Sequence, residues 1–311
     1  MAEIKHTAVI GAGTIGASWA ALFLASGRSV AVYDPSPEAE KTVRAYIERA
    51  WPTMAELGLT ERGTPDAISF HATAADASED ADFIQENVPE RVDIKHATFA
   101  EIEPVISENT IVASSASGLT LGQMQAGWTN PSRFILGHPF NPPHLIPLVE
   151  VMGNDQTACD VIPSAEAFYA DIGKTTIRVN KEVPGHVANR LQAAIWREAI
   201  HLVLSGVASV EDVDKAVSAG PGLRWAAMGP TTLFSLGAGD AGLEAFCAHF
   251  KDTFNGWWDD LGAPYLDEAT TQALVDGMSE AAKGQSTPEL AAKRDALILA
   301  MQKAIKSEAK S

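Results

Sequence analysis

The sequence is poor in cysteine and in positive charge, and each shortage excludes a class of protein. Its only cysteines, Cys159 and Cys247, lie too far apart for metal-ligand spacing, so we expect neither a disulfide framework nor a zinc site. The 23 Lys and Arg residues against 40 Asp and Glu residues give a formal charge of −17. Such a charge repels nucleic acid phosphates and anionic lipid, so neither nucleic acid nor a membrane surface is an expected partner.

Long hydrophobic runs are missing as well. No stretch approaches the roughly 18 apolar residues of a membrane span, and no basic leader with a cleavage site precedes the first hydrophobic run. We therefore expect a cytoplasmic protein. The 311 residues and 46% hydrophobic content suffice for two domains with real cores.

A glycine motif follows the first hydrophobic run, in HTAVIGAGTIGASWAALFLASGRSVAVYD at residues 6–34. Gly11 permits a tight turn, Gly13 lets a pyrophosphate approach the backbone, and Gly16 allows a helix to pack closely on a strand. The helix N-terminus then faces the phosphates with its partial positive charge. The residues expected to border the cofactor here are Gly11, Gly13, Thr14, Ile15 and Gly16.

Asp34 ends the second hydrophobic run, 18 residues beyond Gly16. Its carboxylate is placed to bind both hydroxyls of an adenine ribose and would repel a 2′-phosphate. NAD rather than NADP is therefore the expected cofactor. The alternative, a glycine-rich turn without a ligand, is disfavoured because strand, glycines, helix, second strand and acid occur in register.

The next segments supply further candidates. A helical stretch interrupted at Pro52 precedes strands expected at 68–71 and 83–86, and a helix begins near Val92. Segments just beyond the carboxyl ends of such strands lie over the ligand crevice. Glu90 and Lys95 are therefore candidates to border the nicotinamide, with a solvated helix face as the alternative.

The strand in TIVASSASGL ends in a hydroxyl-rich loop with Ser114, Ser115 and Ser117. Such a loop permits close approach of a ligand and offers it hydrogen bonds. The alternative is that one serine caps the helix expected at 119–126.

The segment GHPFNPPHLIPLVEV at residues 137–151 combines one histidine with one internal carboxylate. The two prolines after Asn141 cannot continue a helix, so we expect strand, loop and strand. His138 would end the first strand, and Glu150 in the second would accept a proton from one ring nitrogen. That arrangement fixes the tautomer of a general base. The alternative is a strand-end histidine beside a surface glutamate.

The pattern changes at Pro184. Strands and helices alternate before it, which indicates an α/β protein with a Rossmann-type, doubly wound, mostly parallel sheet of roughly eight strands. From Pro184 onward only helical patterns remain, with Ser209 as an expected N-cap. We therefore expect an NAD-binding Rossmann domain at 1–183 and a helical domain for substrate binding and dimerisation at 184–311.

The helical half offers three polar or aromatic candidates. Asn189, one turn into its first helix, either reaches the crevice or faces solvent. Arg224 and Trp225 lie in an expected loop at 219–230. The arginine would pair with a protein carboxylate or clamp one on a substrate, and the tryptophan would pack or, with Phe140, face a ligand cation.

These motifs together make the chain resemble the 3-hydroxyacyl-CoA dehydrogenase superfamily over nearly its whole length. The segments that carry the resemblance, in order, are GAGTIG, FIQENVPER, ASSASGL, GHPFNPP, LVEV and PGHVANRL. Within the superfamily, the segments KEVPG, WREAIHLV and GPGLRWAAMG are most similar to those of L-carnitine dehydrogenases. They are next most similar to those of the lambda-crystallin type of L-gulonate dehydrogenase.

The resemblance implies roles for individual residues. His138 and Glu150 would form the catalytic pair, with Ser117 and Asn189 near the reacting hydroxyl. Asn141 would support the loop. It also implies a homodimer formed through the helical domain.

We therefore expect NAD-dependent oxidation of a small 3-hydroxy carboxylate, such as carnitine or a near relative. Arg224 would hold the carboxylate, with Phe140 and Trp225 also lining the substrate. Oxidation of L-gulonate and turnover of a 3-hydroxybutyryl-CoA substrate stay open as alternatives. So does a non-catalytic, crystallin-like protein that binds NAD. No metal is expected, because His138 and His144 have no evident third ligand.

Overall fold

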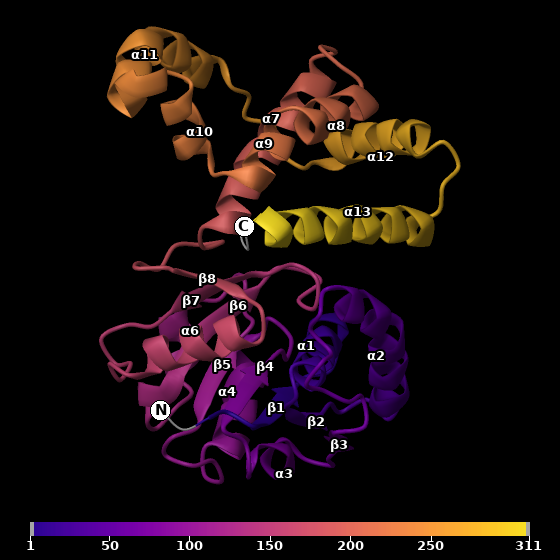
Figure 1. Ribbon diagram of the computed structural model, residues 1–311, viewed down its shortest axis with the longest axis vertical. Helices are drawn as coiled ribbons and strands as arrows, with labels where there is room; N and C mark the ends of the chain where they lie inside the picture. Colours follow the sequence, from indigo (N-terminus) through magenta and orange to yellow (C-terminus); the bar gives the residue numbers. More distant parts are fainter. Residues whose placement is uncertain (1–2, 309–311) are drawn as a thin grey trace. The chain divides into compact units, whose positions relative to one another are not determined.

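The computed structural model describes residues 3–308, which form two compact units (Figure 1). The first unit comprises the residues up to Ala188 together with Ile298–Lys303, and it carries the sheet. The second comprises Asn189–Leu297 and the residues from Ala304 onward, and it is helical.

The sheet has eight strands in the order β3-β2-β1-β4-β5-β6-β7-β8. Every neighbouring pair is parallel except β6 and β7. The predicted fold class, a mostly parallel doubly wound sheet followed by helices, is confirmed. The strands are β1 (His6–Ile10), β2 (Ser29–Tyr33), β3 (Ile68–Phe70), β4 (Phe83–Glu86), β5 (Ile111–Ser114), β6 (Phe134–Pro139), β7 (Leu148–Met152) and β8 (Thr175–Arg178).

Helices cover both faces of this sheet, which is why its central strands are hydrophobic throughout. One core lies beneath α1, α2 and α6 and is built around Trp19, Phe83 and Tyr169. The other lies beneath α3, α4 and α5 and contains Phe99 and Phe134. The helices of this unit are α1 (Thr14–Ala25), α2 (Ala39–Glu56), α3 (Ala74–Ser78), α4 (Val92–Ile102), α5 (Leu121–Gln125) and α6 (Val161–Asp171), with a 3-10 turn at Pro131–Arg133.

One local expectation for the first unit was wrong, and one alternative considered for it does not hold. The helix α2 is not interrupted at Pro52 but runs through it to Glu56, because a proline so close to a helix end removes little of the hydrogen-bond ladder. The N-cap of α5 is Thr120 rather than a serine. It forms a capping box with Gln123, which satisfies two otherwise unpaired backbone N–H groups.

The second unit has its own sequence of helices. Ser209 caps α8 as predicted, accepting from the backbone N–H of Asp212 at 3.1 Å. The expected loop at 219–230 was wrong in part, because Pro221 starts a short helix there, where its missing N–H costs nothing. The helices are α7 (Ala188–Leu204), α8 (Val210–Ala219), α9 (Pro221–Ala227), α10 (Pro230–Leu236), α11 (Gly242–Asp260), α12 (Glu268–Ala282) and α13 (Thr287–Glu308), with a 3-10 turn at Gly239–Ala241. Between residues 3 and 308, no helix combines the length and apolar character that crossing a bilayer requires.

Candidate active site

His138 and Glu150 face each other across the antiparallel strands β6 and β7, where they are register partners. The Nδ1 atom of His138 lies 2.8 Å from Oε2 of Glu150, and the two residues are 6% and 0% exposed. An ionised carboxylate only accepts hydrogen bonds, so Nδ1 carries the hydrogen and Nε2 keeps its lone pair. The hydrogen bond thereby orients the ring, and the lone pair of Nε2 is not used by Glu150.

The second oxygen of Glu150 is held by the start of α7. Its Oε1 atom accepts the backbone N–H groups of Val187 and Ala188, each at 2.9 Å. Burial raises the pKa of Glu150, but the hydrogen bonds from His138, Ala188 and Val187 together bring it below its ordinary value. The carboxylate therefore stays ionised beside the imidazole.

A second buried carboxylate lies at the end of β4 and was not singled out from the sequence. Glu86 binds the ammonium of Lys95 through both oxygens, at 2.7 and 2.8 Å, and both side chains are almost fully buried. The Ser114 hydroxyl donates to the same carboxylate at 2.5 Å, and the backbone N–H of Val88 donates at 2.7 Å. An acid at the end of the buried run FIQE was the available signal. The ammonium of Lys95 is thus engaged by Glu86, and a contact between Lys95 and the nicotinamide stays a prediction.

Glu90 organises the loop that follows β5. Its carboxylate accepts the backbone N–H groups of Ser117 at 3.2 Å, Gly118 at 3.0 Å and Leu119 at 2.8 Å. Although burial raises the pKa of Glu90, these three hydrogen bonds bring it below its ordinary value. The backbone at Ser117 is therefore fixed, while the contact of its hydroxyl with a substrate stays a prediction.

The hydroxyl of the half-buried Ser115 is engaged by side chains of the protein. Its hydroxyl donates to Asn87 at 2.7 Å and accepts from Gln85 at 2.9 Å. The same Gln85 amide donates to the backbone oxygen of Gly137 at 3.1 Å, next to His138. Gln85 thus connects Ser115 to the strand that carries the histidine, and a contact of Ser115 with the cofactor stays a prediction.

The glycine motif forms a cradle that fits a dinucleotide. A Cβ atom at Gly11, where φ is +87°, would lie 2.7 Å from the backbone of Asn87, and one at Gly16 would lie 1.9 Å from the oxygen of Gly11. A Cβ atom at Gly13 would meet no described atom within 4 Å. The close contacts explain why positions 11 and 16 are occupied by glycine. Gly13 is the N-cap residue of α1, and a pyrophosphate could approach through the open space there.

Asp34 lies at the mouth of the same cradle. Its two carboxylate oxygens accept the backbone N–H groups of Ala12 at 2.7 Å and Ser36 at 2.9 Å. Each oxygen retains a second lone pair, which suits two ribose hydroxyls. The residues present therefore fit NAD, with Thr14 and Ile15 starting α1 beside Gly13.

The connection between β6 and β7 is held by a lysine that sequence reasoning missed. The ammonium of Lys174 donates to the backbone oxygens of Pro143 and Ile146, the latter at 2.8 Å, and lies 4.9 Å from the centre of the Trp19 ring. Burial lowers the pKa of Lys174 to about 7. The connection also carries Phe140, whose ring centre is 5.7 Å from that of His138. Asn141, which precedes a cis peptide bond to Pro142, keeps its supporting role as a prediction.

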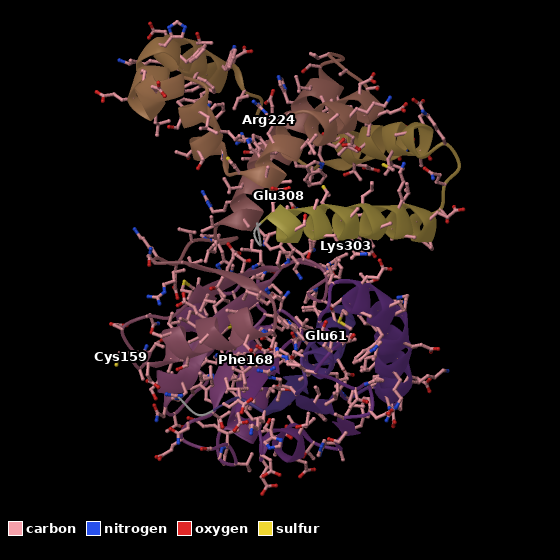
Figure 2. The ribbon with its side chains drawn as sticks, viewed as in Figure 1. Glu61, Cys159, Phe168, Arg224, Lys303 and Glu308 are labelled. Carbon is pink, nitrogen blue, oxygen red and sulfur yellow. The ribbon has the colours of Figure 1, made fainter. Side chains whose placement is uncertain are left out.

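The remaining predicted residues belong to the second unit. Asn189 lies in the first turn of α7, and Arg224 and Trp225 lie on α9, where Figure 2 labels the arginine. Their contacts with a substrate stay predictions.

Comparisons with known proteins identify the family of the chain. The family of the 3-hydroxyacyl-CoA dehydrogenase NAD binding domain matches residues 6–183, and that of the 3-hydroxyacyl-CoA dehydrogenase C-terminal domain matches residues 185–276. L-carnitine dehydrogenase of Streptomyces coelicolor is 44% identical over 293 residues, 94% of this chain and 92% of that protein. L-carnitine dehydrogenase of Pseudomonas aeruginosa is 40% identical over 304 residues, 98% of this chain and 95% of that protein.

Solved structures give the same fold. FHMPC 5-dehydrogenase, an NAD+ dependent dismutase, superimposes with a TM-score of 0.83 at 31% identity, over 98% of this chain and 99% of that one. (S)-3-hydroxybutyryl-CoA dehydrogenase from Ralstonia eutropha superimposes with a TM-score of 0.65 at 25% identity, over 88% of this chain and 95% of that one.

Proposed function

Because the chain belongs to the 3-hydroxyacyl-CoA dehydrogenase family, we propose that it oxidises the 3-hydroxyl group of a small, L-carnitine-like 3-hydroxy carboxylate to the 3-keto acid. The chain is an NAD-dependent dehydrogenase that acts on a CH–OH group, as its family and its relatives at 40–44% identity show. The identity of the acid is the part that is proposed.

The His138–Glu150 pair carries the proposed mechanism. NAD, when bound, supplies the hydride acceptor. His138 takes the hydroxyl proton on Nε2, and the ionised Glu150 stabilises the imidazolium that results. Ser117 and Asn189 hold the reacting oxygen, and Arg224 holds the carboxylate through its planar guanidinium. The supporting observation is the 2.8 Å hydrogen bond that commits Nδ1 and leaves Nε2 available.

A substrate panel tests this function. We expect NADH formation, followed by absorbance, with L-carnitine or a near relative and NAD, and much less with NADP because Asp34 repels a 2′-phosphate. L-gulonate and 3-hydroxybutyryl-CoA are the alternative substrates, and a higher kcat/KM for either would replace the L-carnitine class. If the protein binds NAD but oxidises none of the three, the proposed substrate class would be wrong.

The proposed carboxylate clamp has its own test. Lysine retains the charge of Arg224 but loses its bidentate geometry. We expect Arg224→Lys to raise KM for the hydroxy acid by about tenfold, in line with the loss of one charge-assisted hydrogen bond. An unchanged KM would mean that Arg224 binds a protein carboxylate instead.

We also propose that the protein is a homodimer formed through the second unit. Among the described residues of that unit, only Ile200, Val213 and Thr270 are buried. Large side chains such as Trp196 on α7 and Trp258 on α11 are 51% and 63% exposed. Exposed apolar surface on this scale favours association. Sedimentation should give twice the monomer mass, and Trp196→Glu should produce monomers if α7 lies in the interface.

A cytoplasmic location is part of the same proposal. Both cysteines are exposed free thiols, which suits a reducing compartment. Recovery of the native protein in the cytosolic fraction after cell breakage would support it, and recovery from a secreted or periplasmic fraction would contradict it.

A further inference from the structure

His186 lies in the segment between β8 and α7, directly before the residues that bind Glu150. Its φ is +49° and that of Gly185 is +75°, so two consecutive residues adopt the left-handed conformation. Histidine rarely adopts it unless the surroundings hold it there. Val187 and Ala188, which follow immediately, donate to Glu150. The position of His186 is therefore tied to the catalytic pair.

The ring of His186 is buried beside that of His138. The two ring centres are 5.3 Å apart, and His186 is only 2% exposed. Its Nε2 atom lies 3.3 Å from the backbone oxygen of Ala116, an acceptor, so Nε2 carries the hydrogen. Nδ1 is then an acceptor, and it has no hydrogen-bond partner among residues 3–308.

The imidazole of His186 is neutral near pH 7. Burial lowers its pKa, the hydrogen bond to Ala116 opposes that effect, and the neighbouring His138 lowers the pKa further. The two neighbouring rings thus keep two uncommitted lone pairs, on Nε2 of His138 and on Nδ1 of His186. In the proposed mechanism, Nε2 of His138 accepts the proton of the reacting hydroxyl. No partner is yet assigned to Nδ1 of His186.

A buried acceptor without a donor is uncommon, because the lost hydration is not replaced. A group on a ligand bound beside His138 would replace it. Such a group must be a donor. A carboxylate would be repelled by the lone pair, so the carboxylate end of a 3-hydroxy acid points away from His186. The carbon on the opposite side of the carbinol, C4, then lies nearest to this ring.

We infer that His186 is a specificity-determining residue whose Nδ1 atom accepts a hydrogen bond from an O–H or N–H group on C4 of the substrate. This inference rests on the proposed oxidation of a 3-hydroxy carboxylate. Within that class it favours acids with a 4-hydroxyl or a protonated 4-amino group over acids that lack a donor on C4. The trimethylammonium group of L-carnitine carries no N–H, so it leaves the acceptor unsatisfied.

Four acids with one carbon skeleton test the inference. They are 3-hydroxybutyrate, 3,4-dihydroxybutyrate, 4-amino-3-hydroxybutyrate and L-carnitine, each assayed with NAD for kcat/KM. A site built to pair a donor discriminates strongly against analogues that lack it, so at least one donor-bearing acid should exceed 3-hydroxybutyrate by about tenfold or more. L-carnitine should fall below that donor-bearing acid. The two donor-bearing acids distinguish a hydroxyl from an ammonium.

Two variants separate the acceptor from the shape of the side chain. His186→Phe keeps a flat ring without a lone pair, and His186→Asn keeps an acceptor oxygen and tolerates positive φ. The readout is the ratio of kcat/KM for the preferred donor-bearing acid to that for 3-hydroxybutyrate within each protein, so general damage cancels. We expect the ratio to fall to about one in His186→Phe and to be partly retained in His186→Asn. Thermal unfolding checks that each variant is folded.

The outcomes are distinct. If the wild type oxidises 3-hydroxy acids but prefers neither donor-bearing acid, the inference fails while the proposed function stands. An unchanged ratio in a folded His186→Phe variant also overturns it and assigns Nδ1 to an internal water. If none of the four acids is oxidised, the proposed function fails together with the inference.

Discussion

The first unit buries two carboxylates completely, Glu86 and Glu150, and uses them differently. Each accepts at least one backbone N–H and at least one side-chain donor, which is what an ion needs when it is removed from water. The partner of Glu86 is the side chain of Lys95, which is itself 1% exposed. The partner of Glu150 is the imidazole of His138, which uses Nδ1 for this contact and leaves Nε2 uncommitted. The contrast that we propose is that the Glu86–Lys95 pair serves mainly stability, whereas the Glu150–His138 pair serves the chemistry.

The largest effect on activity should come from removing His138, the partner of Glu150. In His138→Ala no group accepts the hydroxyl proton, so kcat should fall by about 10⁴-fold, the upper end for a general base. NADH binding, measured by fluorescence titration, should be unchanged because the cradle lies elsewhere. Retained turnover would show that the base is another residue and would end the contrast between the two pairs.

Removing Lys95, the partner of Glu86, should lower stability instead. In Lys95→Met the charge of Glu86 stays buried without its partner, and the free energy of unfolding should fall by about 3–5 kcal/mol. Chemical denaturation measures it. The double variant Lys95→Met with Glu86→Leu should recover part of the loss, since no charge then remains unpaired. Equal destabilisation of single and double variants would argue against a buried ion pair.

The same substitution in both acids gives a matched comparison. Glu150→Gln should lower kcat by about 10²-fold or more, because a neutral amide stabilises neither the imidazolium nor the required tautomer. Glu86→Gln is the control and should affect kcat per folded molecule by much less than tenfold. If Glu86→Gln lowers kcat as strongly, the first pair takes part in the chemistry and the distinction is lost.

The smallest expected effect is on stability at acid pH. The pKa of Glu150 lies below its ordinary value in the folded state, so its charge contributes stability above the unfolded value of about 4.3. That contribution is lost as pH falls through the lower folded value. The difference in unfolding free energy between wild type and Glu150→Gln should therefore be constant from pH 7 to about 5 and shrink below about 4. If this difference in unfolding free energy did not depend on pH, the charge of Glu150 would not contribute to stability as proposed.

The sequence predicted those features whose partners follow a regular pattern. The glycine motif and Asp34 are set by spacing along one β-α-β segment. His138 and Glu150 could be paired because a short connection between two strands places them opposite each other. Strand alternation likewise predicted the sheet.

The sequence did not predict contacts that depend on tertiary packing. The pairing of Glu86 with Lys95 joins a strand end to a helix, and nothing in FIQE distinguished a buried acid from one at a solvated strand end. The role of His186 depends on a left-handed backbone that histidine seldom adopts. Lys174 was missed because its partners are backbone oxygens, which carry no sequence signature.

Chemical rescue tests the central claim most directly, by replacing the imidazole that His138→Ala removes. NADH formation by this variant should increase with added imidazole, and the increase should be much smaller when Glu150→Gln is also present, because the acid orients the added base. High turnover without imidazole, or rescue that does not depend on Glu150, would contradict a general base polarised by that carboxylate.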